Sequence, residues 1–452
     1  MQLVAYGAQD IYLTGNPQIT FFKVVYRRHT NFSMEAIVQT FSGHPGFGSD
    51  VVATISRNGD LVHKMYLEHE LKTETGENCT LVANYGSRLM KECELEIGGQ
   101  RIDKHYGHWH SVYSQLTEFN PSGSTETLYN KMTGNGLGLN TDAGGGAVLA
   151  PAWNASQTGV GPEGPPQIRG KIWVPLLFWF CRNPGLALPL IALQYHEVKV
   201  KINFEELTRL ILKDGEPSGD FGQGNTLSPS PPEATFNLWC DYIYLDTDER
   251  RRFAQVSHEY LIEQVQFSEF SGTTAGAPAT LDLNFNHPVK ELIWTGGISS
   301  RSGEGIDMTA RSDAQITAMK GANSAYFTEQ NIAGEWQLKL NGHDRFKERD
   351  FKYFTRTQVW QHHTGYGAVN NPDSIAVYSF ALKPEEHQPS GTCNFSRIDN
   401  AQLTGSYSSK QNKNGTGDGN LEDQDGNLVF VYAVNYNVLR IMSGMGGLAY
   451  SN

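Results

Sequence analysis

Short segments of alternating apolar and polar residues occur twice along the chain in the same order, and this repeat constrains the fold more than any other feature. The segment Val62–Leu67 resembles Val289–Trp294, 227 residues later, and Glu94–Gly99 resembles Gln337–Gly342, 243 residues later. Such alternation is typical of a β-strand with one buried face. The repeat therefore predicts two similar β-structured units in tandem.

A further pair of matches places the extra length of the first unit in one stretch of sequence. Val174–Phe180 resembles Ile375–Phe380, and Asn237–Asp246 resembles Val434–Ser443, both at an offset near 200. The fall in offset from 243 to about 200 requires about 43 extra residues in the first unit. Residues 121–170 can supply them, because this stretch is rich in glycine and proline and has no sustained period. We expect it to form a long surface loop.

The rest of the sequence also favours strands over helices. Val198–Phe204 alternates without interruption, and few stretches show the 3.6-residue period of an amphipathic helix. The dipeptides Gly98-Gly99 and Asn341-Gly342 follow predicted strands and tolerate the positive φ of two-residue hairpin turns. A composition with 47 Gly, 20 Tyr and 22 Phe but 19% charged residues indicates the same class. The expected fold class is all-β with antiparallel sheets.

The chain length requires more than one hydrophobic core. Single cores stop growing near about 250–300 residues, whereas this chain has 452. The charged run from Asp246 to Arg252 separates a predicted strand ending at Leu245 from the next apolar run. We therefore expect a first domain over residues 1–245, a linker over 246–256 and a second domain over 257–452.

The charge balance disfavours nucleic acid as a direct partner. The chain has 48 acidic and 36 basic residues, a formal net charge of −12, and such a surface repels a phosphate backbone. Three consecutive arginines, Arg250–Arg252, follow closely on three acidic residues, so they do not form a basic patch. Direct coating of a genome is not expected.

Cysteine usage and apolar run lengths indicate a protein that is neither disulfide-linked nor membrane-spanning. Val174–Phe180 and Leu186–Leu193 are the longest apolar runs, and a spanning helix needs roughly 20 residues. The cysteines are odd in number and contain no C-x-x-C pair, so we expect buried thiols in a reducing compartment. They are Cys79, Cys93, Cys181, Cys240 and Cys393.

No segment carries a complete catalytic, nucleotide-binding or cofactor-binding motif. The stretch Gly164–Lys171 has five residues between its glycines where a phosphate loop needs four, and two prolines stand where backbone donors are required. Asp423–Asn427 resembles part of a calcium loop but lacks the bidentate glutamate at the required distance. We therefore expect no catalytic residue, no cofactor and no enzymatic activity.

One histidine cluster leaves a metal site open as an alternative. His105, His108 and His110 lie close together, and two of them on alternate strand positions could share a metal ion. The interleaved Tyr106 and Trp109 favour a packed aromatic segment instead. The packed segment is the preferred interpretation, and no metal is expected.

Two sequons are candidate glycosylation sites. Asn154 and Asn414 each begin an Asn-x-Ser/Thr sequence in a glycine-rich stretch, where a glycan would be accessible. The first residues show neither a basic nor an apolar signal region, so glycosylation by the ordinary secretory route is not expected.

Several longer strings are specific enough to indicate a family. They are the opening Leu3–Lys23, Ser56–Leu61, Glu94–Lys104, Pro184–Leu193, Gln388–Arg397 and the tail Leu439–Tyr450. Together they resemble the major capsid proteins of nucleocytoplasmic large DNA viruses, most closely the algal-virus type, and the resemblance covers essentially the whole chain.

The resemblance implies a specific architecture and set of partners. The fold would be two consecutive eight-stranded jelly rolls, and three subunits would form a pseudo-hexagonal capsomer that tiles an icosahedral shell through trimer–trimer contacts. Minor capsid proteins, penton proteins and glycans would be partners, and an internal viral membrane would lie nearby. The protein would be made and assembled in the host cytoplasm and would reside in the virion.

The resemblance also orients the subunit. The N-terminal segment, residues 1–30, would lie at the base of the sandwich, towards the virion interior, and residues 121–170 would crown the outer face. Residues 121–170 and 295–335 match no family pattern, so surface decoration and contacts with the host are not fixed by it.

Two other classes of protein are retained as alternatives. Eight Trp, many Tyr and glycine-rich loops suggest a glycan-binding, lectin-like β-sandwich, because aromatic faces stack on sugars. A metal-dependent enzyme built on His105, His108 and His110 is the third possibility.

Overall fold

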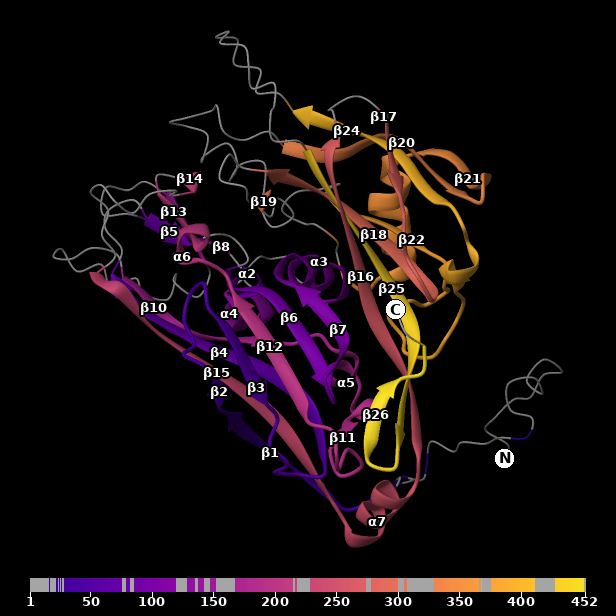
Figure 1. The fold of residues 1–452 in the computed structure, drawn as a ribbon. Coiled ribbons are helices and arrows are strands. Elements are labelled where there is room, and N and C mark those ends of the chain that lie inside the picture. Colours follow the sequence, from indigo (N-terminus) through magenta and orange to yellow (C-terminus); the bar gives the residue numbers. More distant parts are fainter. Residues whose placement is uncertain are drawn as a thin grey trace, which may run out of the picture.

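The protein consists of two antiparallel jelly rolls, one formed by each half of the chain (Figure 1). The computed structural model describes residues 28–74, 79–81, 85–118, 128–134, 137–141, 147–151, 167–213, 216–217, 228–273, 278–299, 305–306, 329–365, 375–410 and 427–450, with Asn16, Phe22, Val24, Tyr26 and Gly367. Strands predominate among these residues, as the alternating sequence predicts.

The first roll is a sandwich of two antiparallel sheets. Its eight main strands are β1 (Phe32–Gln39), β3 (Asp50–Thr54), β4 (Leu61–Glu74), β6 (Met90–Ile97), β7 (Gln100–Tyr106), β10 (Gln167–Pro175), β12 (Val198–Phe204) and β15 (Ser228–Leu245). One sheet has the order β1-β15-β4-β10 and the other contains the order β3-β12-β6-β7.

The second roll repeats this arrangement. Its main strands are β16 (His258–Thr273), β17 (Pro278–Asp282), β18 (Pro288–Ser299), β20 (Glu329–Leu340), β21 (His343–Asp350), β22 (Ile375–Ser379), β24 (Ala401–Lys410) and β25 (Asn427–Met442). β16, β25, β18 and β22 pair in that order, and the facing sheet has the order β17-β24-β20-β21. In both rolls the first strand along the chain pairs with the eighth, as a jelly roll requires.

The sequence repeat corresponds to equivalent strands of the two rolls. Its first two matches fall on β4 with β18 and on the β6–β7 hairpin with the β20–β21 hairpin. The match between β15 and β25 joins the right strands in the wrong register. Leu238 pairs with Leu67, and Val431 pairs with Trp294, which is the equivalent of Leu67 in the second roll. Leu238 therefore corresponds to Val431 and not to Asn435, which lies four positions further along.

Both predicted hairpin turns are confirmed. Ile97 pairs with Gln100 and Leu340 pairs with His343, so each loop contains two residues. Gly98, Gly99, Asn341 and Gly342 all have positive φ, between 52° and 85°. Two consecutive residues of positive φ match the right-handed twist of the flanking strands.

Seven short α-helices connect the strands among the described residues. They are α2 (Tyr85–Leu89), α3 (Gly107–Thr117), α4 (Leu128–Thr133), α5 (Trp179–Arg182), α6 (Leu207–Leu210), α7 (Thr247–Gln255) and α9 (Gln358–His362). A π-helical turn over Tyr353–Thr357 precedes α9, and 3-10 turns lie at Pro184–Leu186 and Phe395–Arg397.

Minor strands complete the sheets and loops. They are β2 (Phe41–Ser42), β5 (Cys79–Leu81), β8 (Leu137–Thr141), β9 (Ala147–Pro151), β11 (Leu188–Pro189), β13 (Ile211–Lys213), β14 (Glu216–Pro217), β19 (Gly305–Ile306), β23 (Cys393–Asn394) and β26 (Met445–Leu448). Residues 121–170 are thus more than a plain loop, because they contain α4, the β8–β9 hairpin and the start of β10.

The charged run after β15 forms helix α7, at the foot of the molecule between the two rolls (Figure 1). Asp246 caps this helix by accepting a hydrogen bond from the backbone N–H of Thr247. Arg250 donates two hydrogen bonds, of 2.9 and 3.1 Å, to the Asp60 carboxylate beside β4. The helix is therefore tied to the first roll.

Each roll has its own core, and the two cores are linked. The first core includes Ile262, Leu439 and Ile441, which belong to the second half of the chain. The second core lies inside the second roll around Trp294 and Trp336. A third apolar cluster lies between the rolls. None of the helices in the described ranges is long and apolar enough to cross a membrane.

Candidate functional site at the junction of the two rolls

Helix α3 of the first roll covers the outer face of a sheet of the second roll. A row of four neighbours crosses that face, because Phe267 pairs with Tyr432, Tyr432 with Ile293, and Ile293 with Val377. The last three are fully buried. The ring of Trp109 on α3 lies 5.0 Å from that of Tyr432, and the ring of Tyr106, just before α3, lies 4.6 Å from that of Phe267. We call Phe267, Tyr432, Ile293 and Val377 the covered row.

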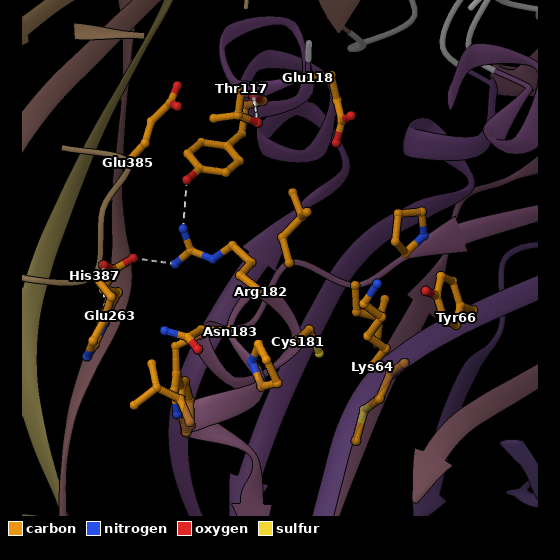
Figure 2. Close-up of a pocket in the computed structure, with 18 of the residues that line it drawn as sticks. Lys64, Tyr66, Thr117, Glu118, Cys181, Arg182, Asn183, Glu263, Glu385 and His387 are labelled. Atoms are coloured by element: carbon orange, nitrogen blue, oxygen red, sulfur yellow. Dashed lines mark hydrogen bonds and ion pairs between the residues drawn. The ribbon is translucent and has the colours of Figure 1, made fainter. Parts of the chain in front are cut away.

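A buried ion cluster joins the rolls beside this apolar contact. Arg182, at the end of α5, donates a 2.5 Å hydrogen bond to the Glu263 carboxylate on β16 and a 2.7 Å hydrogen bond to the Tyr113 hydroxyl on α3 (Figure 2). The other Glu263 oxygen lies 2.8 Å from the Lys290 ammonium on β18 and 3.6 Å from His387. One carboxylate of the second roll therefore binds a cation from each roll.

Electrostatics keep Glu263 ionised despite its burial. Burial alone would raise the pKa of Glu263, which is 4% exposed, but Arg182, His387 and Lys290 outweigh it and hold the pKa well below its usual range. Burial lowers the pKa of Lys290, and the Glu263 charge opposes that change only in part. The cluster depends on all its members, because each charge would be costly to bury alone.

A second group of charges continues the cluster towards α9. The two ring nitrogens of His363 lie 3.0 Å from Glu291 and 2.9 Å from Glu385. Burial would lower the pKa of His363, but the two carboxylates outweigh it and raise the pKa to about 9. His363 is therefore a cation at neutral pH, wedged between carboxylates of the second roll.

The raised pKa of His363 makes part of the stability dependent on pH. The protonated His363 contributes about 3 kcal/mol to the free energy of unfolding. This contribution is fully present below the unfolded pKa of about 6.5 and is lost as the pH rises through the folded pKa of about 9. We expect the difference in unfolding free energy between wild type and His363→Gln to shrink by about that amount between pH 6 and pH 10. Urea unfolding at each pH measures it. A difference for His363→Gln that stays constant between pH 6 and pH 10 would contradict the assignment.

A cavity of about 620 Å³ opens next to the ion cluster. Figure 2 shows Lys64 and Tyr66 of β4 on one side of it and Glu385 and His387 of the second roll on the other. Pro175, Leu177 and residues of α3, α4 and α5 also line it. Among the described residues, no group of three His, Cys, Asp or Glu side chains is arranged to hold a metal ion.

The three histidines of the predicted cluster point to different partners. β7 ends at Tyr106, so His105 lies on a strand while His108 and His110 lie on α3, and the alternate strand positions expected for them do not exist. His105 contacts Asp103 at 2.9 Å, and His108 lies 2.8 Å from the Tyr432 hydroxyl across the junction. Burial, with a smaller effect from His105, lowers the pKa of His110 to about 3. The packed interpretation fits this geometry.

The remaining candidate residues are buried, half-buried or outside the described residues. Cys93, Cys181 and Cys240 are buried free thiols as expected, and Cys393 is half-buried. Asn154 and Asn414 lie outside the described residues, as do most of residues 1–30 and the acidic turn after residue 420.

Half of the tryptophans are unavailable to a sugar. Trp109, Trp179, Trp294 and Trp336 are all 2% exposed or less, so they serve the cores and the junction and offer no face to a ligand. Composition alone suggested a lectin-like surface, but burial removes half of that argument.

The ion cluster was not predicted from the sequence, although the sequence contains a signal for it. Lys290 and Glu291 interrupt the apolar run of β18, and Glu263 interrupts that of β16. Charged residues inside otherwise apolar strands are rarely buried unless they are paired. No pattern, however, indicated that Arg182 would be the partner, because 81 residues separate it from Glu263.

Two family models together match nearly the whole chain. Residues 20–246 match the model described as the major capsid protein N-terminus. Residues 249–447 match the model described as the large eukaryotic DNA virus major capsid protein.

Individual relatives agree with these models. The major capsid protein of Pyramimonas orientalis virus is 47% identical, over 100% of this chain and 99% of the relative. That of Paramecium bursaria Chlorella virus 1 is 42% identical over the same shares. A solved structure, a quasi-atomic model of the PBCV-1 virus capsid, superposes with a TM-score of 0.70 at 35% identity and covers 96% of this chain and 100% of that chain.

Proposed function

Because the chain belongs to the major capsid proteins of large eukaryotic DNA viruses and forms part of the virion capsid, we propose that three copies assemble into a pseudo-hexagonal capsomer. These capsomers tile the icosahedral shell through contacts between trimers. The protein acts by building this surface, without catalysis, and is made and assembled into the virion capsid in the host cytoplasm.

One observation carries this proposal: the chain contains two rolls of the same topology, packed side by side through α3 (Figure 1). Two similar rolls give each subunit two similar flanks, so three subunits supply six rolls around one axis. A hexagonal outline arises in this way from a three-fold assembly.

The division into domains is part of the same proposal. Residues 1–245 form the first roll with its N-terminal segment, 246–256 the linker, and 257–452 the second roll. The end of β15 at Leu245 and the position of α7 support these boundaries. The partners expected from the resemblance, namely minor capsid and penton proteins, surface glycans and a nearby internal membrane, complete the proposed setting.

The native mass of the purified protein tests the proposal. We expect one species at three times 50.2 kDa in native mass spectrometry at micromolar concentration, unchanged on tenfold dilution. A stable monomer under these conditions would contradict the proposed trimer.

A further inference from the structure

The covered row of the second roll has an equivalent in the first roll that lies open. Along the ladders of the first roll Val38 pairs with Trp239, Trp239 with Tyr66, and Tyr66 with Pro175. These four positions correspond strand by strand to the covered row, since β1, β15, β4 and β10 are the equivalents of β16, β25, β18 and β22. We call Val38, Tyr66, Pro175 and Trp239 the open face.

The open face differs from the covered row in its exposure. Val38 is 46% exposed, and the other three members are half-buried, whereas in the covered row Tyr432, Ile293 and Val377 are fully buried and only Phe267 is half-buried. Tyr66 and Pro175 also line the cavity of about 620 Å³. The cavity therefore lies beside the position that α3 would occupy if the first roll were covered as the second roll is.

The open face is preorganised by hydrogen bonds. The indole N–H groups of Trp239 and Trp173 donate to one oxygen of Glu68, at 3.1 and 3.2 Å, and Asn237 donates to the other oxygen at 3.2 Å. Two aromatic rings are thus held in place at the surface, and rigid exposed aromatic groups are typical of the energetic centre of a protein interface.

The equivalent of α3 in the second roll carries largely exposed apolar side chains. α9 lies between the fifth and sixth main strands of its roll, as α3 does in the first roll. Its Trp360 is 82% exposed, and Leu382, which follows β22, is 76% exposed. His362 on α9 contacts the Leu382 carbonyl at 3.2 Å, so the two apolar side chains come from adjoining segments. We call Trp360 and Leu382 the α9 patch.

The geometry points to docking of the α9 patch of one copy on the open face of a second copy, with Trp360 entering the cavity beside Tyr66. This inference rests on the proposed trimer and specifies its contact. Within each chain, α3 packs on the covered row of the second roll. The α9 patch and the open face of the first roll are the equivalent pair of surfaces, and they remain at least partly exposed. Such a heterologous contact propagates from copy to copy and ends when the ring closes.

Disrupting either surface tests the contact. We expect Trp360→Asp and Tyr66→Asp each to weaken association by about 30-fold or more, so that native mass spectrometry at micromolar concentration shows monomers. Val256→Asp is the matched control, because Val256 is 54% exposed at the end of α7, away from both surfaces, and should remain a trimer. Circular dichroism should show folded monomers, since Trp360 packs little within its own chain.

Mixing the two variants provides a decisive second measurement. The Trp360→Asp variant keeps the open face unchanged, and the Tyr66→Asp variant keeps the α9 patch unchanged. An equimolar mixture should therefore form a dimer of twice 50.2 kDa, to which no third copy can be added to close a ring. Trimers in both single variants would overturn the docking and leave the proposed trimer intact. Monomers in the mixture would overturn the pairing of these two surfaces. A monomeric wild type would overturn the trimer and the docking together.

Discussion

Replacing Glu263 with glutamine is expected to lower the free energy of unfolding by about 3–5 kcal/mol, because it leaves the buried Lys290 and the half-buried Arg182 without their carboxylate. Arg182 and Lys290 contact opposite oxygens of Glu263 at 2.5 and 2.8 Å, and the Lys290 side chain is only 1% exposed, against 26% for Arg182. A neutral amide of the same size keeps the packing and removes the charge. Urea unfolding of wild type and variant at pH 7 measures the loss.

A control on the same strand separates burial from charge. Glu259 forms an ion pair of 2.8 Å with Arg440, and its side chain is 59% exposed. Glu259→Gln should therefore cost between about 0 and 1 kcal/mol. Equal losses in the two variants would mean that the Glu263 cluster is no more than a surface ion pair.

Trp109→Ala is expected to cost about 3–5 kcal/mol, because it removes the largest apolar side chain of α3 from the junction. Trp109 is 2% exposed and packs on Tyr432 and on Tyr113, whose ring centroids lie 5.0 and 4.9 Å away. The remaining side chains belong to two different rolls, so they cannot close the hole without moving one roll against the other. Thermal and urea unfolding measure the effect.

Two further variants provide a scale for the stability loss expected from Trp109→Ala. Trp109→Phe retains an aromatic ring and should lose clearly less than Trp109→Ala. Val256→Ala, at an exposed position, should stay within about 0.5 kcal/mol of wild type. A loss from Trp109→Ala as small as that of the control would show that α3 does not hold the rolls together.

Local features of the fold follow directly from the sequence. The run Val198–Phe204 is the whole of β12, and the two hairpins lie where the dipeptides predict them. These features depend on neighbouring residues, whose alternation and tolerance of positive φ are visible in the sequence.

Register could not be predicted because alternation has a period of two. A shift of four residues between β15 and β25 places every side chain on the same face as before, so the pattern scores both alignments alike. The cross-strand partners decide between them, and they lie far away in sequence. The four-residue error in matching Leu238 therefore could not be detected from the alternation of apolar and polar residues.

Helix α3 shows how a visible signal was misread. Trp109, Val112, Tyr113 and Leu116 have the spacing of one helical face, and all four are buried against the second roll. The segment was instead considered as a strand with two of its histidines at alternate positions, whereas His108 and His110 lie on α3. Gly107 permits the change from strand to helix, because a Cβ there would lie 2.4 Å from the Met90 carbonyl oxygen.

The composition of the first core has a consequence for synthesis on the ribosome. Leu439 and Ile441 lie at the end of the last long strand, yet they pack with residues of the first half of the chain. A nascent chain therefore cannot complete its first roll until almost the whole protein has been translated, although domains usually fold in order of emergence. A product truncated before Leu439 would leave an apolar gap in that roll, and we expect proteases to cleave it more readily than the full-length chain.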